Sequence, residues 1–302
     1  MTTTAADLVA RRPKSERVIE FGLSAAALVG VVTTIGIVVV LVYQTIGFFT
    51  QVSIVEFLTG TKWSASITPY AWGILPLVAG TFVVAGIAMV VGAPLGLLAA
   101  VFLAEYASDR TRNTVKPILE AIAGIPTIVL GFFAINWLTP VVLKPLIPGI
   151  GGFSALAAGI VVGILITPLI TSLSDDAMRA VPRSLREGAY AMGATKWEVI
   201  RSVVFRAAIS GIAASLILAV SRAAGETMAV YLAAGTNPQL TLDPRQSVET
   251  MTVFIAAVSL GDTPSTSIQF QSLFAVGATL FAITFGLNIL SERIVRRFRT
   301  HY

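Results

Sequence analysis

The stretch LPLVAGTFVVAGIAMVVGAPLGLLAAVFLA, residues 75–104, runs for 30 residues without a charged side chain. An α-helix rises about 1.5 Å per residue, so roughly 20 apolar residues cross a hydrocarbon core about 30 Å thick. Five more predominantly apolar runs lie at 21–49, 117–138, 153–173, 209–234 and 270–290. We therefore predict an all-α, polytopic membrane protein with six transmembrane helices. The first run is too long for the core of a signal peptide, so we expect it to remain as the first helix.

The composition supports this class and excludes several kinds of site. Of the 302 residues, 55% are hydrophobic and 12% are charged, whereas soluble domains carry about 25% charged residues. The chain has no cysteine, which excludes disulfides, thiolate metal sites and cysteine nucleophiles. Its one histidine, His301, is the penultimate residue. We expect no catalytic residue, no metal site and no cofactor.

Lysines and arginines are distributed unevenly between the connections of these runs. Both chain ends and alternate connections carry 17 of the 21, and Arg222 lies inside the fifth run. The remaining connections hold only Lys62, Lys144 and Arg245. Because cytoplasmic loops are enriched in these residues, we place both termini in the cytoplasm. The net charge of +5 then belongs to the cytoplasmic face, and we expect no nucleic-acid partner.

Two pairs of glycines lie within the second and fourth runs. Gly92 and Gly96 form one pair, and Gly159 and Gly163 form the other. Small residues one helical turn apart let two helices approach closely in a membrane. We expect these positions to serve helix packing.

Aromatic residues gather near the outer ends of the runs. They are Trp63, Tyr70, Trp72 and Trp137. Tryptophan and tyrosine are enriched where a membrane meets water, so the placement predicts an interfacial aromatic belt.

The longest polar interval that faces the cytoplasm spans residues 174–208 and contains EGAYAMGATKWE at 187–198. Ser184, with Glu187 three residues later, has the spacing of a capping box and predicts a helix start. Gly193 would end that short helix, and Thr195 would begin another. By composition alone, the segment could equally be an amphipathic helix lying on the lipid surface.

Glu187, Gly188 and Ala189, followed after three residues by Gly193, resemble the EAA signature of ABC importer permeases. In that family the loop forms a coupling helix that docks on the ATPase. The resemblance implies a coupling role for Glu187, Gly188, Ala189, Gly193, Thr195 and Lys196. Two positions depart from the signature: Gly188 replaces an alanine, and Arg206 stands where the family has a proline.

An arginine and a glutamate lie inside the fifth run. A central arginine costs about 2.5–3.5 kcal/mol on insertion scales, so Arg222 should face protein or a water-filled path. Glu226, four residues on, lies on the same face of a continuous helix and could pair with it. A structural ion pair is one interpretation. The other places Arg222 and Glu226 on the translocation path of an anion.

Four further segments resemble the phosphate-specific Pst-type importers, and the PstC-type subunit in particular. They are residues 57–63 with 73–77, 94–106, 120–131 and 222–229. The resemblance implies type I ABC permease architecture and a bacterial plasma (inner) membrane location. It also implies a heterodimer with a PstA-type permease, a PstB-type ATPase dimer, an external PstS-type phosphate-binding protein, and inorganic phosphate as cargo.

The chain lacks the Gly-x-x-x-x-Gly-Lys-[Ser/Thr] loop, so we expect ATP hydrolysis on another polypeptide and no enzyme activity here. Two alternatives stay open: a permease for sulfate or molybdate, and a secondary transporter in which Glu226 carries a proton. We divide the chain into a cytoplasmic tail (1–20), a permease domain (21–292) that includes the 174–208 coupling loop, and a basic cytoplasmic tail (293–302).

Overall fold

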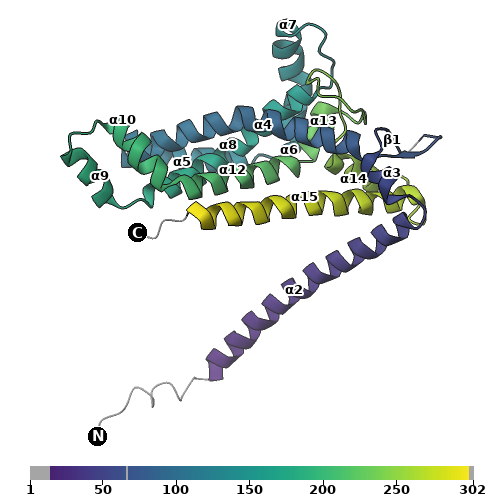
Figure 1. The fold of residues 1–302 in the computed structure, drawn as a ribbon, viewed down its shortest axis with the longest axis horizontal. Coiled ribbons are helices and arrows are strands. Elements are labelled where there is room, and N and C mark those ends of the chain that lie inside the picture. Colours follow the sequence, from purple (N-terminus) through teal and green to yellow (C-terminus); the bar gives the residue numbers. More distant parts are fainter. Residues whose placement is uncertain (1–13, 66, 299–302) are drawn as a thin grey trace.

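A computed structural model describes residues 14–65 and 67–298, and within them the chain is an elongated helical bundle (Figure 1). The only strands among these residues are β1 (Trp63–Ser64) and β2 (Ala71–Trp72), which pair antiparallel with Trp63 opposite Trp72. The all-α prediction is confirmed. The predicted tails, 1–20 and 293–302, lie partly outside the described residues.

The helices follow the chain with three π-helical segments among them. The α-helices are α2 (Lys14–Phe49), α3 (Ile54–Thr59), α4 (Leu75–Val101), α5 (Asp109–Ala123), α6 (Thr127–Phe133), α7 (Lys144–Leu146), α8 (Ala155–Arg179), α9 (Arg183–Ala191), α10 (Lys196–Val199), α11 (Phe205–Ala207), α12 (Ile209–Ala224), α13 (Met228–Ala234), α14 (Met251–Leu260) and α15 (Ile268–Phe298). The π-helical segments are η1 (Phe102–Tyr106), η2 (Ala134–Leu143) and η3 (Ile200–Val204).

Five helical segments of the described chain are long and apolar enough to cross a membrane. They are Val18–Phe49, Leu75–Tyr106, Thr127–Leu146, Ala155–Arg179 and Ile268–Ile294. The described chain reaches six spans if the bent pair Lys196–Ala207 and α12, which meet at 70°, is counted as one broken span. This bend lies at Ala208 and forms although Arg206 replaces the expected proline. The prediction of six spans agrees with the upper count.

The third span begins later than its hydropathy predicts. The predicted start at 117 falls inside α5, whose charged residues include Arg112 and Lys116. That helix ends at Gly124, and Pro126 follows before α6 begins at Thr127. A proline disfavours helical backbone at the residue before it, which separates the surface helix from the span.

The fifth predicted run, 209–234, contains a second interruption. Helix α12 ends at Ala224, residues Gly225–Thr227 leave the helix, and α13 resumes at Met228. The sequence analysis treated this run as one continuous helix, and that expectation was wrong.

Helices α4 and α8 pack closely because four glycines alternate across their contact. A Cβ on Gly92 would stand 2.7 Å from the carbonyl oxygen of Gly163, and one on Gly163 would stand 2.8 Å from Cβ of Val91. Gly96 and Gly159 face Ile170 and Ile87 just as tightly. The predicted packing role of the two glycine pairs is confirmed. Helix α8 lies at the centre of the bundle and contributes much of its buried core.

The outer end of the bundle holds an aromatic cluster rather than the predicted belt. Trp63 and Trp72 are buried, and their rings meet edge to face with centroids 5.8 Å apart. Phe254 packs on Trp63 at 4.9 Å, and Phe48 packs on Trp72 at 5.5 Å. These two tryptophans therefore fasten the β1–β2 hairpin to α2 and α14. Tyr70 and Trp137 stay exposed.

Candidate functional site

The candidate site is the cytoplasmic end of the bundle, where α9 and α10 lie beyond the ends of the spans, at the far end from β1 (Figure 1). Helix α9 begins after Pro182 rather than after the predicted Ser184, which lies inside the helix. Proline has no backbone N–H, and its fixed φ suits the residues around a helix start. Glu187 is therefore not needed as a cap, and its side chain is exposed.

The end of α9 and the start of α10 follow the prediction. Gly193 has φ +83°, its amide donates to the Tyr190 carbonyl at 2.9 Å, and the amide of Ala194 donates to Ala189 at 3.2 Å. Thr195 then caps α10: its amide donates to Oε2 of Glu198 at 2.7 Å, and its hydroxyl accepts from the Glu198 amide at 3.5 Å. The backbone hydrogen bond from Thr195 is the main reason that the pKa of Glu198 is lowered. The segment is thus two short helices with a fixed turn between them.

The exposed side of this helix pair mixes apolar and charged side chains. Met192 is 89% exposed and Trp197 59% exposed, beside the exposed Glu187 and Lys196. Lys196 Nζ lies 4.5 Å from the ring centre of Tyr106 in η1. Large apolar side chains gathered at a polar tip are typical of a protein-binding surface. A Cβ at Gly188 would meet nothing within 4 Å, so the alanine of the signature would fit there.

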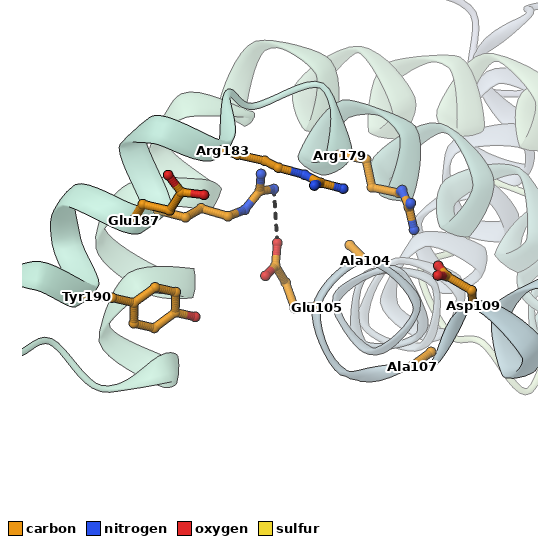
Figure 2. Close-up of a pocket in the computed structure, with 9 residues that line it drawn as sticks. Ala104, Glu105, Ala107, Asp109, Arg179, Arg183, Glu187 and Tyr190 are labelled. Carbon is orange, nitrogen blue, oxygen red and sulfur yellow. Dashed lines mark hydrogen bonds and ion pairs between the residues drawn. The ribbon is translucent and has the colours of Figure 1, made fainter.

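Arg186 anchors α9 to the spans. Its Nη1 donates to the Val181 carbonyl at 2.7 Å, and its Nη2 donates to the Met178 carbonyl at 2.8 Å and to Oε1 of Glu105 at 3.1 Å. This ion pair joins α9 to Glu105 at the end of the second span, and the dashed line at Glu105 in Figure 2 marks it. The sequence analysis did not single out this contact, because 81 residues separate its partners.

A cleft of about 410 Å³ opens beside this anchor, between α8, α9 and η1. Arg179 and Arg183 extend over it from α8 and α9, and Glu187 and Tyr190 stand at its side (Figure 2). Within the described chain, neither Arg179 nor Arg183 has an ion pair within 4.0 Å. The cleft therefore offers two free guanidinium groups next to the exposed carboxylate of Glu187.

A second ionic cluster ties α5 to the last turns of α8. Asp175 is fully buried, and its Oδ2 accepts from Arg112 Nη2 at 2.8 Å and from Lys116 Nζ at 3.3 Å. Lys116 also reaches Oδ1 of Asp176 at 2.6 Å. The sequence analysis missed this cluster, although two aspartates ending an apolar helix and two basic residues spaced i, i+4 were visible signals.

Arg222 and Glu226 do not form the predicted pair. Arg222 lies in the last turn of α12 with an exposed side chain, and no ion pair is found for it in the described structure. Glu226 is 9% exposed, and its Oε1 instead accepts from the amide of Ala229 at 3.4 Å. The break at Gly225 explains this, because the four-residue spacing brings side chains together only on a continuous helix. The carbonyl of Glu226 also accepts from Thr252 Oγ1 at 2.8 Å.

Comparisons with known proteins concern the family and the fold of this chain. The profile of the family described as binding-protein-dependent transport system inner membrane component matches residues 92–300. The chain is 34% identical over 277 residues to the probable ABC transporter permease protein YqgH of Bacillus subtilis, covering 91% of this chain and 89% of that protein. It is 31% identical over 260 residues to the phosphate transport system permease protein PstC of Haemophilus influenzae, covering 80% and 81%.

The fold is similar to a solved structure of a bacterial alginate ABC transporter in complex with an alginate pentasaccharide-bound periplasmic protein. The TM-score is 0.64 at 15% identity, with 96% of this chain and 99% of that chain covered. At this identity the likeness concerns the fold alone.

Proposed function

This chain belongs to the family of binding-protein-dependent transport system inner membrane components, and from that premise we propose that it is the permease subunit through which an ATP-driven importer moves inorganic phosphate. Membership and the helical architecture make it a multi-pass plasma-membrane permease of the type I ABC importer class. The relatives are named as permease proteins, and we assign ATP hydrolysis to a separate subunit.

The observation that carries the phosphate proposal is the position of Arg222. It lies midway along the 209–234 run, on an open face of α12 that also carries Leu218, and the exposed Gly225 follows directly after the helix. A free guanidinium is a strong binder of phosphate oxygens, which it can contact through two parallel hydrogen bonds. A likeness to a protein named as a phosphate permease supports the same cargo.

Arg222 also supports the presence of a second permease subunit. An arginine exposed to lipid at this depth is costly, so protein or a water-filled path must cover this face. We propose a PstA-type permease as that cover, with Arg222 lining the path between the two subunits. Glu226, bound to the start of α13, would hold the interrupted helix beside it rather than neutralise the arginine.

We propose that α9 and α10 form the coupling element, with Glu187, Gly188, Ala189, Gly193, Thr195 and Lys196 in contact with a PstB-type ATPase dimer. The exposed apolar tip supports this role, because apolar side chains on the surface favour contact with another protein. The contacts of Arg186 support it because they hold α9 rigidly against the ends of the spans. The other partner in the proposal is an extracytoplasmic PstS-type phosphate-binding protein. In this arrangement residues 21–292 form the permease domain, between a tail at 1–20 and a basic tail at 293–302.

Reconstitution in liposomes tests the proposal. The chain, its permease partner, the ATPase and the binding protein are incorporated together, and uptake of labelled phosphate is measured with ATP or a non-hydrolysable analogue inside. We expect uptake only with ATP, and no inhibition by a hundredfold excess of sulfate or molybdate.

Two outcomes favour the alternatives. Equal competition by sulfate or molybdate would make the chain a permease for another oxyanion. Uptake driven by a proton gradient without ATP would contradict the importer mechanism and favour a secondary transporter that uses Glu226.

A further inference from the structure

A cavity of about 510 Å³ opens at the outer end of the molecule, between the β1–β2 hairpin, α13 and α14. We call it the outer acidic cavity. In Figure 1 the hairpin and α14 lie at the opposite end from α9. Its lining includes the aromatic residues Trp63, Tyr231 and Phe254 and the acidic Glu249. None of the lining residues carries a positive charge.

Glu249 is the one carboxylate in this lining, and the fold holds it firmly. Its carbonyl oxygen lies so close to α4 that a Cβ on Gly80 would clash with it. Two residues further on, the amide of Met251 donates to Oγ1 of Thr81 at 3.0 Å. Glu249 is 6% exposed, and its carboxylate makes no hydrogen bond or ion pair with any residue the structure describes. Burial raises the pKa of Glu249 to about 8.

The aromatic wall of the cavity gives a second, independent observation. The rings of Trp63 and Phe254 pack edge to face at 4.9 Å, and Tyr231 also lines the cavity. The cavity therefore places an unpartnered buried carboxyl group beside aromatic rings.

The charge of the Glu249 carboxylate decides which kind of ligand fits the outer acidic cavity. A buried carboxylate is stable only when it is protonated or paired with a cation. An ionised Glu249 would repel an oxyanion, and the lining contains no basic residue that could bind one. A lysine or arginine side chain would instead form an ion pair with Glu249 and lie against the ring faces of the wall.

We propose that the outer acidic cavity receives a lysine or arginine side chain of the extracytoplasmic binding protein when that protein docks on the permease. The proposal rests on the proposed function only in requiring such a binding protein. It does not depend on phosphate being the cargo.

The ionisable groups around Glu249 are few. Tyr231 lies in the lining, Lys62 and Asp262 each precede a lining residue in sequence, and Asp243 and Arg245 pair with each other at 2.8 Å in the loop before it. Helix α4 contributes the uncharged Gly80 and Thr81, and the nearest segment of the fifth span contributes Glu226, whose carbonyl accepts from Thr252. Because docking would take the proton from Glu249, affinity for the binding protein should rise with pH up to about 8 and then level off.

The test measures docking and not transport. The assembled importer is placed in nanodiscs, and its affinity for the purified, substrate-loaded binding protein is determined at pH 6, 7, 8 and 9. We expect Glu249→Gln to weaken binding at pH 8 at least tenfold and to flatten the pH dependence. The matched control is Asp262→Asn, an exposed carboxylate between the lining residues Gly261 and Thr263 that does not itself line the cavity, and it should stay within twofold of the native importer.

A double-mutant cycle identifies the partner side chain. Each lysine and arginine on the docking face of the binding protein is changed to alanine, and one of these changes should have no further effect in the Glu249→Gln importer. This experiment also works when Glu249→Gln lowers the stability of the importer. Each loss of affinity is measured relative to the unchanged binding protein on the same importer.

Three results would overturn the proposal. One is an unchanged affinity and pH profile in Glu249→Gln. Another is loss of the permease heterodimer in the Glu249→Gln importer when the binding protein is absent, which would assign the cavity to the contact with the second permease. The third is binding of free inorganic phosphate to the importer that is lost in Glu249→Gln, which would make the cavity a cargo site. Failure of phosphate uptake with intact docking would contradict the proposed cargo and leave this proposal standing.

Discussion

Arg186 of α9 donates a hydrogen bond to Glu105 of η1, with Nη2 and Oε1 3.1 Å apart, while the same guanidinium holds the carbonyls of Met178 and Val181. The side chains of Arg186 and Glu105 are 16% and 7% exposed. One residue thus joins the cytoplasmic helix pair to the ends of the second and fourth spans. Because α4 and α8 pack closely through interleaved glycines, we expect a displacement of α9 to move both spans together.

Replacing Arg186 by alanine should uncouple the importer. The change leaves Glu105 and two carbonyls without their donor, at a cost of about 1–3 kcal/mol for each buried group. We expect ATP hydrolysis to continue while phosphate uptake per ATP falls severalfold, measured together in proteoliposomes. Arg110→Ala, an exposed arginine without an ion pair in the described structure, is the control. An unchanged ratio of phosphate transported to ATP hydrolysed would show that the contacts of Arg186 do not couple hydrolysis to transport.

Glu187→Arg should weaken the contact with the ATPase. The side chain is exposed on α9, so its reversal adds a third free positive charge beside Arg179 and Arg183 without disturbing the core. Less ATPase should co-purify, or hydrolysis should lose its dependence on the binding protein. The matched control is Glu56→Arg, an exposed helical glutamate in α3 at the outer end. Equal effects of the two reversals would count against docking at α9.

Arg222→Gln should abolish transport while the complex still assembles. Arg222 makes no ion pair in the described chain, so its loss removes a charge from the proposed path without leaving a buried partner behind. Uptake should fall to background, and the amount of ATPase retained on purification should not change. Arg110→Gln should transport normally. Normal uptake by Arg222→Gln would remove this residue from the path.

Gly163→Ala should destabilise the bundle although it adds only one methyl group. The new Cβ would stand 2.8 Å from Cβ of Val91 and 3.0 Å from the Ala88 carbonyl oxygen, so α4 and α8 must separate. We expect a loss of about 1–3 kcal/mol, seen as a lower Tm in detergent. Gly86→Ala, where the Cβ meets nothing within 4 Å, should be neutral or slightly stabilising. An equal Tm for Gly163→Ala and Gly86→Ala would contradict the close contact between α4 and α8.

The isolated permease should lose stability as pH rises from about 4.5 to about 8, and Glu249→Gln should remove that loss. The pKa of Glu249 is raised from 4.5 to about 8 by burial, so the native chain keeps a proton that the unfolded chain releases. The stabilisation is full below the lower value and is lost by the upper one. The difference between variant and native chain should grow over this window to at most roughly 5 kcal/mol, at 1.36 kcal/mol per pKa unit.

Unfolding midpoints of the purified chain at pH 4, 7 and 9 measure this difference. A constant difference between Glu249→Gln and the native protein would show that the carboxyl is not buried in the isolated chain.

Several local features of this fold followed from the sequence because neighbours along the chain specify them. Gly193 ends α9 since it takes a positive φ, and Thr195 begins α10 since its capping partner Glu198 lies three residues away. The glycine pairs of α4 and α8 were also predictable, because their spacing is a property of each helix alone. Ser184 was the wrong helix start because Pro182, two residues earlier, offers a better one.

The predictions that were wrong depend on tertiary contacts rather than on neighbours along the chain. The Arg222–Glu226 pair was expected from helical spacing, but the chain leaves the helix at Gly225 so that Glu226 can bind the start of α13. Trp63 and Trp72 have the composition of a belt, yet hairpin pairing turns both rings into a common core. The contacts of Arg186 with Glu105 and of Arg112 with Asp175 join residues 81 and 63 positions apart.

The sequence by itself determined the class, the positions of most of the apolar spans and the family signature, because hydropathy is summed over whole segments and needs no partner. Only the tertiary structure decided which charges are paired, which are free and which are buried. Those properties depend on where distant segments meet, and a break of three residues in the fifth span is enough to redirect them. The free guanidinium of Arg222, the anchor of Arg186 and the unpartnered carboxyl of Glu249 are all of this second kind.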